Sequence, residues 1–262
     1  MDKQAILRSY SQPDEKLLLA KVLDQADLSL KKHIVCFTDF FDPAMCAKAC
    51  TMLKSIRDLG FRAFGGYEDA ERKMIAMYPD YMYAEDIVFP MAAVTISYVS
   101  RFSSELSHRD YLGSVLGLGI ERSRVGDIAV LEGSAVCFVK EDIADYIVSG
   151  LERVGHTKVK TERTDISEVE LPEKKMDIKN VTVSSLRADT VFGAVFQKSR
   201  SETQELIKGE KASINWTEVK SVSDIVKEGD ILSLKGSGRG KLIEVGGMTK
   251  KGRLVITVGR YV

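Results

Sequence analysis

Residues 185–209 read SLRADTVFGAVFQKSRSETQELIKG, and this stretch predicts two short helices. The second helix has both of its ends marked in the sequence. Ser199 and Glu202 have the spacing of a capping box, in which a hydroxyl and a carboxylate satisfy free N–H groups at a helix start. Gly209 is expected to end the helix in the left-handed conformation.

Strands and a basic loop follow the helices. Ala212, Ile214 and Trp216 alternate with polar residues, and a turn leads into a further strand at 231–234. The loop reads Lys235-Gly-Ser-Gly-Arg-Gly-Lys241 and is broken by glycines. Long cationic side chains and N–H groups at helix starts bind phosphates without any reactive centre. The stretch is therefore interpreted as a binding surface on which these cations converge.

This stretch resembles the S-four RNA-binding domain, which is named after a small-subunit ribosomal protein. The resemblance rests on Arg187-x-Asp189, Ser199-Arg200, Leu206-Ile207, Gly209, Asn215 and Gly229-Asp230-Ile231. Ala188 departs from the family pattern, which usually has Leu, and Gly209 lies one residue early relative to Asn215. The resemblance implies an RNA-binding face made of Arg187, Lys198, Ser199, Arg200, Lys208, Lys211, Asn215, Lys235, Arg239 and Lys241.

The Asn215-Trp216 pair and the long upstream part are similar to YlmH-like bacterial proteins. That resemblance implies a cytoplasmic RNA-binding protein without chemistry of its own and without a cofactor. Its implied RNA is ribosomal RNA, tRNA or both. The implied partner is a large ribosomal subunit that still carries peptidyl-tRNA, in the quality control of stalled ribosomes. We expect a monomer that does not bind membranes.

Formal charge is zero over the 262 residues but is unevenly distributed. Residues 181–262 hold 14 Lys and Arg against 9 Asp and Glu, whereas residues 1–180 hold 24 against 29. Such asymmetry indicates either polyanion binding or only a solvated basic face. The four cysteines form no CxxC pair, which fits reduced thiols in a cytosolic protein and no metal site. No apolar run approaches the roughly twenty residues that span a bilayer.

The upstream residues predict an α+β chain. Residues 1–80 are expected to form a helical lead-in and a βαβ unit, with strands at 33–37 and 61–67 and a further helix at 68–77. Residues 81–165 have a β-α-β-β-α-β order, which predicts a ferredoxin-like (split βαβ) domain. The charged residues 166–180 are interpreted as a linker or edge segment. Residues 181–262 complete the chain as the S-four-type α+β domain.

Residues 108–127 are a second candidate site. The His108-Arg-Asp110 triplet lacks the other parts of a kinase catalytic loop, and no nucleophile elbow or dinucleotide fingerprint is present. Two interpretations stay open on the residues alone: an RNA-contacting edge, or an internal connection in which acids neutralise the arginines. A similar Gly-x-Gly-Ile-x-Arg stretch in YlmH-like proteins favours the first. It implicates Arg109, Gly119, Arg122, Arg124 and Asp127.

Two other functions remain as alternatives. An RNA-modifying enzyme, such as a pseudouridine synthase or methyltransferase, would use the same small domain to dock, but its catalytic signatures are missing from the sequence. An adaptor, with the link to cell division that YlmH-like relatives suggest, would use the acidic upstream half as its principal surface. Turnover of nucleotides or salt-insensitive association would favour these alternatives.

Overall fold

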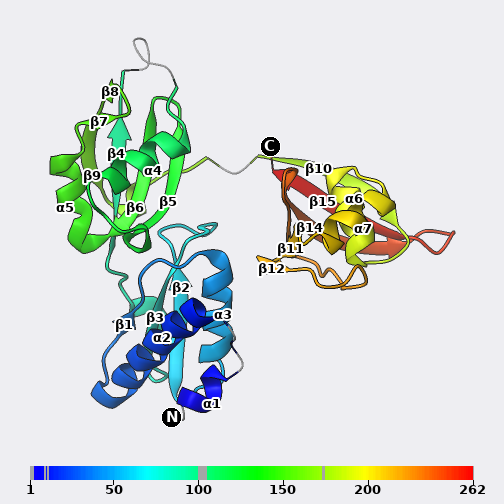
Figure 1. The fold of residues 1–262 in the computed structure, drawn as a ribbon, viewed down its shortest axis with the longest axis horizontal. Helices are drawn as coiled ribbons and strands as arrows, with labels where there is room; N and C mark the ends of the chain where they lie inside the picture. The colour runs from blue at the N-terminus through cyan, green and yellow to red at the C-terminus, as the bar shows by residue number, and fades with distance from the viewer. Residues whose placement is uncertain (1–2, 9, 11, 100–104, 173–174, 262) are drawn as a thin grey trace. The chain divides into compact units, whose positions relative to one another are not determined.

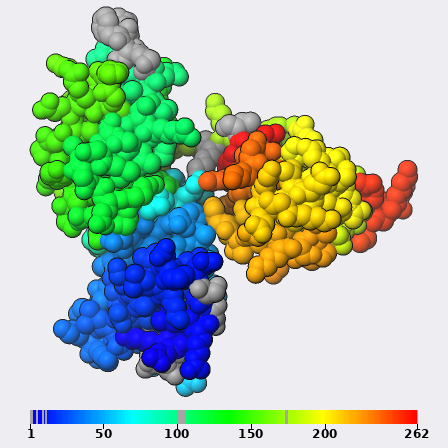
Figure 2. All heavy atoms as spheres, viewed as in Figure 1, coloured from blue at the N-terminus to red at the C-terminus, as the bar shows by residue number. Residues whose placement is uncertain are grey.

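The computed structural model describes residues 3–8, 10, 12–99, 105–172 and 175–261 (Figure 1). The chain is a mixed α/β protein whose sheets are antiparallel. It divides into two compact units, Met1–Leu171 and Pro172–Val262. In Figure 2 the first unit runs from blue to green and the second from yellow-green to red. Each unit has its own hydrophobic core.

The upstream unit begins with a three-stranded sheet in the order β1-β3-β2. Its elements are α1 (Lys3–Leu7), α2 (Pro13–Lys32), β1 (Cys36–Phe37), α3 (Pro43–Leu53), β2 (Leu59–Phe64) and β3 (Met74–Pro79). Both β1 and β2 run antiparallel to β3, so they are parallel to each other with β3 between them. Leu19, Leu23 and Ala26 of α2 pack with Leu53 of α3 against the sheet. This is a βαβ unit with a third strand inserted.

The helix expected at 68–77 is wrong, because β3 begins at Met74. All six β3 residues are buried, since this strand is the central one of its sheet. A short continuous apolar run fits a buried strand as well as a buried helix, and periodicity alone does not separate them. The strand expected at 33–37 is also shorter, Cys36–Phe37.

A four-stranded sheet follows in the same unit, in the order β5-β6-β4-β9 with every neighbouring pair antiparallel. Its elements are β4 (Met91–Ser97), α4 (His108–Gly117), β5 (Val125–Leu131), β6 (Ser134–Lys140), α5 (Glu141–Gly150) and β9 (Lys160–Thr164), with a small hairpin of β7 (Arg153–Val154) and β8 (Thr157–Lys158). Tyr111 of α4 and Ile147 of α5 are buried in one core with Val94 and Ile96 of β4. Ala93 and Phe138 pack on the other sheet face with a separate cluster. The two helices therefore cover one face.

The C-terminal unit is a six-stranded antiparallel sheet in the order β10-β15-β14-β13-β11-β12. Its elements are β10 (Met176–Val183), α6 (Ala188–Phe196), α7 (Arg200–Lys208), β11 (Ala212–Ile214), β12 (Thr217–Glu218), β13 (Ile231–Leu234), β14 (Gly238–Met248) and β15 (Leu254–Tyr261). Figure 1 shows α6 and α7 on one side of this sheet. Val191, Phe192 and Val195 of α6 lie in its core with Leu242 and Val258.

Two details make the sequence expectations more specific. Of residues 166–180, which were expected to be a linker or an edge segment, residues 176–180 belong to the edge strand β10, which pairs with β15 from Met176 to Val183. Of that segment, residues 173–174 lie outside the described residues. Gly209 does not end α7 in the left-handed conformation: its φ is −85°, and Glu210 takes the left-handed φ of 56° instead. The stop signal is thus displaced by one residue.

We expect Gly240→Ala to destabilise the C-terminal unit by about 1–3 kcal/mol, because an added methyl group overpacks a filled core. A Cβ at residue 240 would lie 2.3 Å from Cγ1 of Val195 and 2.7 Å from the carbonyl oxygen of Gly259. Urea unfolding followed by circular dichroism measures the change. Gly247→Ala in the same strand is the control, since its Cβ would meet no atom within 4 Å. Equal effects of the two changes would contradict this packing.

Candidate nucleic-acid interface

The carboxylate of Asp189 is the centre of the cationic cluster at the start of α6. Its side chain is fully buried, and it accepts hydrogen bonds from Nε of Arg187 at 3.2 Å and Nε of Arg200 at 3.0 Å. Nε2 of Gln204 donates at 2.7 Å and the Thr190 hydroxyl at 3.2 Å. One acid therefore ties α6 to α7.

Burial by itself would raise the pKa of the Asp189 carboxyl. The hydrogen bonds from Arg187, Gln204 and Arg200 outweigh burial and hold the pKa well below its usual range. The group is thus a carboxylate at neutral pH. Its one negative charge faces two guanidinium groups, so a net positive charge remains at the cluster.

Local sequence explains why these side chains meet. Gln197 takes a left-handed φ of 55° and ends α6, and the Ser199 hydroxyl then accepts a hydrogen bond from the Glu202 N–H to start α7. Gly193 allows the close turn, because a Cβ there would lie 3.0 Å from the carbonyl oxygen of Lys198. Arg200 and Gln204 are four residues apart and share one face of α7.

Exposure separates the roles of the two arginines. The Arg200 side chain is 61% exposed and that of Arg187 is 34% exposed. Arg200 binds Asp189 through Nε, and within the described part of the chain its two terminal nitrogens have no hydrogen-bond partner. Arg187 uses both Nε and Nη2 on the carboxylate. Arg200 is therefore fixed at its base and presents its outer nitrogens to solvent, as phosphate recognition requires.

The remaining candidates on α7 differ in how available they are. Lys198 is paired with Glu202, and the Ser199 hydroxyl is occupied by the helix cap. Lys208 is exposed at the end of α7 and has no ion-pair partner among the residues that the structure describes. Lys208 is therefore the more available lysine of this helix.

Arg239 and Lys241 lie on the other face of the sheet. Gly240 and Leu242 point towards α6 and the core, and side chains alternate along β14. The expected convergence of all the cations on one surface is therefore wrong: the Asp189 cluster and the β14 cations occupy opposite faces. The sequence predicts residues 235–241 to be a loop, and a loop has no alternation of faces. The structure shows a turn followed by a strand, in which successive side chains point to opposite faces of the sheet.

Asn215 has an internal role. Its Nδ2 donates to Asp230 at 2.7 Å, and its Oδ1 accepts the Ile231 N–H at 2.9 Å. These bonds join the β11–β12 turn to the start of β13. The Asn215 amide is thus used by the fold, and its place on the RNA-binding face stays a prediction.

The second candidate edge is also largely internal. Asp127 accepts from the Tyr67 hydroxyl at 2.8 Å and from the N–H groups of Glu71 and Arg72 at 2.7 and 3.0 Å. Arg122 donates to the carbonyls of Val125 and Gly126. Arg122 and Asp127 therefore have structural roles, and their contact with RNA stays a prediction.

Three other residues complete that edge. Arg124 is paired with Asp142, whereas Arg109 and Gly119 are exposed. Gly119 has a left-handed φ of 83° and open space around the position of a Cβ. Of the five residues expected to form this RNA-contacting edge, only Arg109 and Gly119 are exposed and without a side-chain partner among the described residues.

Sequence reasoning missed Arg72 and Gln204. Nη2 of Arg72 donates to the carbonyls of Phe40 and Arg122 at 2.9 and 3.3 Å, and its Nε donates to Val125 at 3.0 Å. These bonds join segments far apart in sequence, so no local pattern marks them. Gln204 was detectable, because it lies one helical turn from Arg200.

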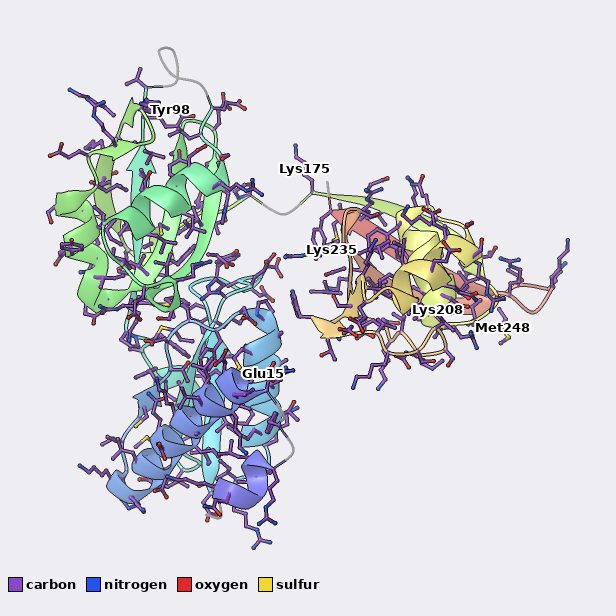
Figure 3. The ribbon with its side chains drawn as sticks, viewed as in Figure 1. Glu15, Tyr98, Lys175, Lys208, Lys235 and Met248 are labelled. Carbon is purple, nitrogen blue, oxygen red and sulfur yellow. The ribbon has the colours of Figure 1, made fainter. Side chains whose placement is uncertain are left out.

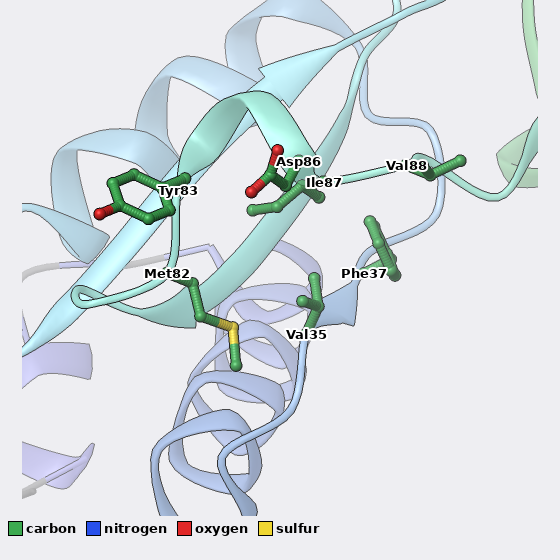
Figure 4. A pocket seen from close by; sticks show the side chains of 7 residues that line it. All are labelled: Val35, Phe37, Met82, Tyr83, Asp86, Ile87 and Val88. Carbon is green, nitrogen blue, oxygen red and sulfur yellow. The ribbon is translucent and has the colours of Figure 1, made fainter.

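A pocket of about 440 Å³ lies in the upstream unit beside β1 (Figure 4). Its lining is mainly apolar, with Val35, Phe37, Met82 and Ile87 facing the space and Asp86 as its one acidic residue. The described residues hold no group of three or more His, Cys, Asp and Glu that could bind a metal ion. Nor does any described helix combine the length and apolar character that crossing a bilayer demands.

Comparisons with known proteins give a consistent result. A family model described as "YlmH, N-terminal" matches residues 15–82, and one described as "Putative RNA-binding domain in YlmH" matches residues 85–168. The chain is 33% identical over 250 residues to "Ribosome-associated protein quality control protein P2" of Bacillus subtilis (strain 168), which covers 94% of this chain and 95% of that protein.

A solved structure is also similar, "Cell division protein ylmH from Streptococcus pneumoniae", with a TM-score of 0.52 and 22% identity. The match covers 61% of this chain and 96% of that one. At this identity the similarity shows the fold alone.

We expect Asp189→Asn to destabilise the C-terminal unit by about 2–4 kcal/mol at neutral pH, because it leaves two arginines without their buried acid. Because folding lowers the pKa of the Asp189 carboxyl, the stability of the unit should also depend on pH. The contribution of Asp189 to stability is complete above the pKa of an unfolded Asp, about 4, and is lost as the pH falls towards the lower pKa of the folded state. Urea unfolding between neutral and acidic pH measures both effects. Asp177→Asn, at an exposed pair with Lys179, is the control. An unchanged acid dependence in Asp189→Asn would contradict this assignment.

Proposed function

This chain belongs to the YlmH family, and from that premise we propose that it is an RNA-binding protein that docks on structured RNA of the ribosome. Support comes from the match of residues 85–168 to an RNA-binding family model and from the name of the Bacillus subtilis relative. Ribosomes lie in the bacterial cytoplasm, so the same proposal places the chain there.

The observation that carries the proposal is the geometry of Arg200. Its Nε is held by a fully buried carboxylate, while the side chain as a whole is 61% exposed. A guanidinium fixed in this way loses little side-chain entropy when it meets a phosphate, and its outer nitrogens can donate two parallel hydrogen bonds. Arg187 and Lys208 add positive charge from the same helix pair.

At a finer level we propose that the C-terminal unit is an S-four-type domain, and that residues 81–165 form a ferredoxin-like (split βαβ) domain. Two capped helices followed by antiparallel strands support the first. For the second, the strand order β5-β6-β4-β9 supports it, because β4 and β5 are parallel with β6 between them. Residues 1–80 would then form a separate α/β part of the upstream unit.

The YlmH resemblance implies a more specific binding partner. This partner is a large ribosomal subunit that carries peptidyl-tRNA, in the quality control of stalled ribosomes. The relative's name supports a ribosomal role of this kind. Arg109 and Gly119 are proposed as the upstream contact with RNA, since both are exposed. We propose a role in binding and not in catalysis. No observation favours a nucleotide-modifying reaction or a cell-division adaptor over this role.

We expect Lys208→Ala and Arg200→Ala each to weaken binding to purified bacterial large ribosomal subunits. Each change removes about one phosphate contact, so the slope of log affinity against log salt should fall by about 1. Cosedimentation at salt concentrations between roughly 50 and 200 mM measures this slope. Arg200 also holds Asp189, so circular dichroism must show that each variant is folded.

Lys250→Ala provides the matched control, because Lys250 is an exposed lysine in the turn between β14 and β15. Its slope should equal that of the unchanged protein. Association that does not respond to salt, or turnover of a modified nucleotide, would overturn the proposed function.

A further inference from the structure

A second pocket of about 440 Å³ lies on the C-terminal unit, between the β11–β12 hairpin and the turn before β14. Its wall includes Trp216, Lys211, Lys235 and Arg239. Ser213, Ser233 and Arg239 stand in one register row across β11, β13 and β14, on the face opposite α6. The Asp189 cluster uses none of these residues. The pocket is therefore separate from that cluster.

The backbone of Trp216 is unusual. Asn215 and Trp216 form the two-residue turn between β11 and β12, with left-handed φ angles of 46° and 61°. Such a turn favours Asn followed by Gly, and a bulky residue in the second position is strained. Strain of this kind is retained where the surrounding structure or a function requires it.

Packing does not explain the tryptophan. Over the described residues, the core of the unit is built from α6, α7 and the strand residues that face them, and Trp216 is not part of it. Its indole N–H is buried, as is the Ser233 hydroxyl, and neither has a hydrogen-bond partner in the described chain. Buried groups without partners cost free energy, so holding the ring against the pocket carries a cost that no hydrogen bond of these two groups offsets.

The charges around the ring are mixed. Lys211 and Lys235 have no ion-pair partner among the residues described, whereas Glu210 and Glu218 also line the pocket. Two carboxylates would repel a bare polyphosphate. They can accept hydrogen bonds from the N–H groups of a base edge, while lysines contact the phosphate. This mixture fits one nucleotide with its base exposed.

We propose that the pocket binds an unpaired nucleotide of the RNA, with its base stacked on Trp216 and its phosphate contacted by Lys211 and Lys235. The inference rests on the proposed function and adds a single-stranded element to it. Bases that are splayed out of a loop or bulge commonly stack on aromatic side chains, and a paired base in a duplex cannot do so. Lys241 lies two residues beyond Arg239 on the same sheet face and continues the cationic row.

Trp216 is the only tryptophan in the sequence, so its fluorescence reports on this pocket alone. The full-length protein is titrated with a five-nucleotide single-stranded RNA, with a blunt duplex of the same composition and with guanosine monophosphate. We expect quenching by the single strand at concentrations about tenfold lower than by the duplex or the free nucleotide. Equal quenching by the duplex or by the free nucleotide would overturn the inference.

Absence of quenching by the single strand would also overturn it. If binding to ribosomal subunits persisted in that case, the proposed function would stand without this pocket. If ribosome binding were lost as well, both would fail.

Lys235→Ala should weaken the single-strand titration about five- to tenfold through loss of one phosphate contact. Lys250→Ala should leave it unchanged. Figure 3 labels Lys235 and Met248 at opposite ends of the C-terminal unit, and Lys250 is two residues beyond Met248. Equal effects of the two lysine variants would count against a local phosphate contact.

Trp216→Gly separates a binding role from a structural one. Glycine accepts the left-handed φ, so the unfolding midpoint of the C-terminal unit should stay unchanged or rise by about 4 °C. Binding of a fluorescently labelled five-nucleotide RNA, measured by anisotropy, should weaken about tenfold. Trp216→Phe, which keeps a stacking ring, should recover most of that loss. A lower midpoint with unchanged RNA binding would show that the ring is only structural.

Discussion

The buried carboxylate of Asp189 is the constraint on which the C-terminal unit depends. A buried charge is tolerated only when its partners compensate it, and here two arginines, one glutamine and one threonine do so. The same contacts orient Arg200 outward. Folding and the proposed recognition of phosphate therefore use one group of atoms, and a change at Asp189 cannot affect one without the other.

The upstream unit uses similar chemistry for a different purpose. Asp127 and Arg72 also gather several hydrogen bonds, but their partners are mainly backbone groups, and the bonds connect the first sheet with the start of β5. A sequence stretch that contains arginine and glycine thus indicates an RNA-binding surface only when the guanidinium group is not already hydrogen-bonded within the protein. Arg122, bonded to two carbonyls, is the counterexample within this chain.

Local signals predicted much of the fold. The Ser199 cap marks the start of α7, and the two short helices expected at 185–209 are α6 and α7. The helix expected at 68–77 was wrong where β3 (Met74–Pro79) begins, because a buried central strand has no alternating pattern of apolar and polar residues.

The candidate site was predicted less completely. The cations of residues 187–241 could be named, but the face each occupies depends on sheet register, which the sequence does not display. Hydrogen bonds between residues far apart in the chain, such as that of Arg72 to the carbonyl of Phe40, have no local sequence pattern from which they could be predicted.

The pairing of β10 with β15 has a broader consequence. The first strand of the C-terminal unit is hydrogen-bonded to its last strand along eight residues, with Met176 opposite Tyr261. A module whose incoming and outgoing strands lie side by side can be transplanted between proteins without unravelling its interior. The start and the end of this unit thus lie next to each other, so one corner of its sheet suffices to join it to another domain.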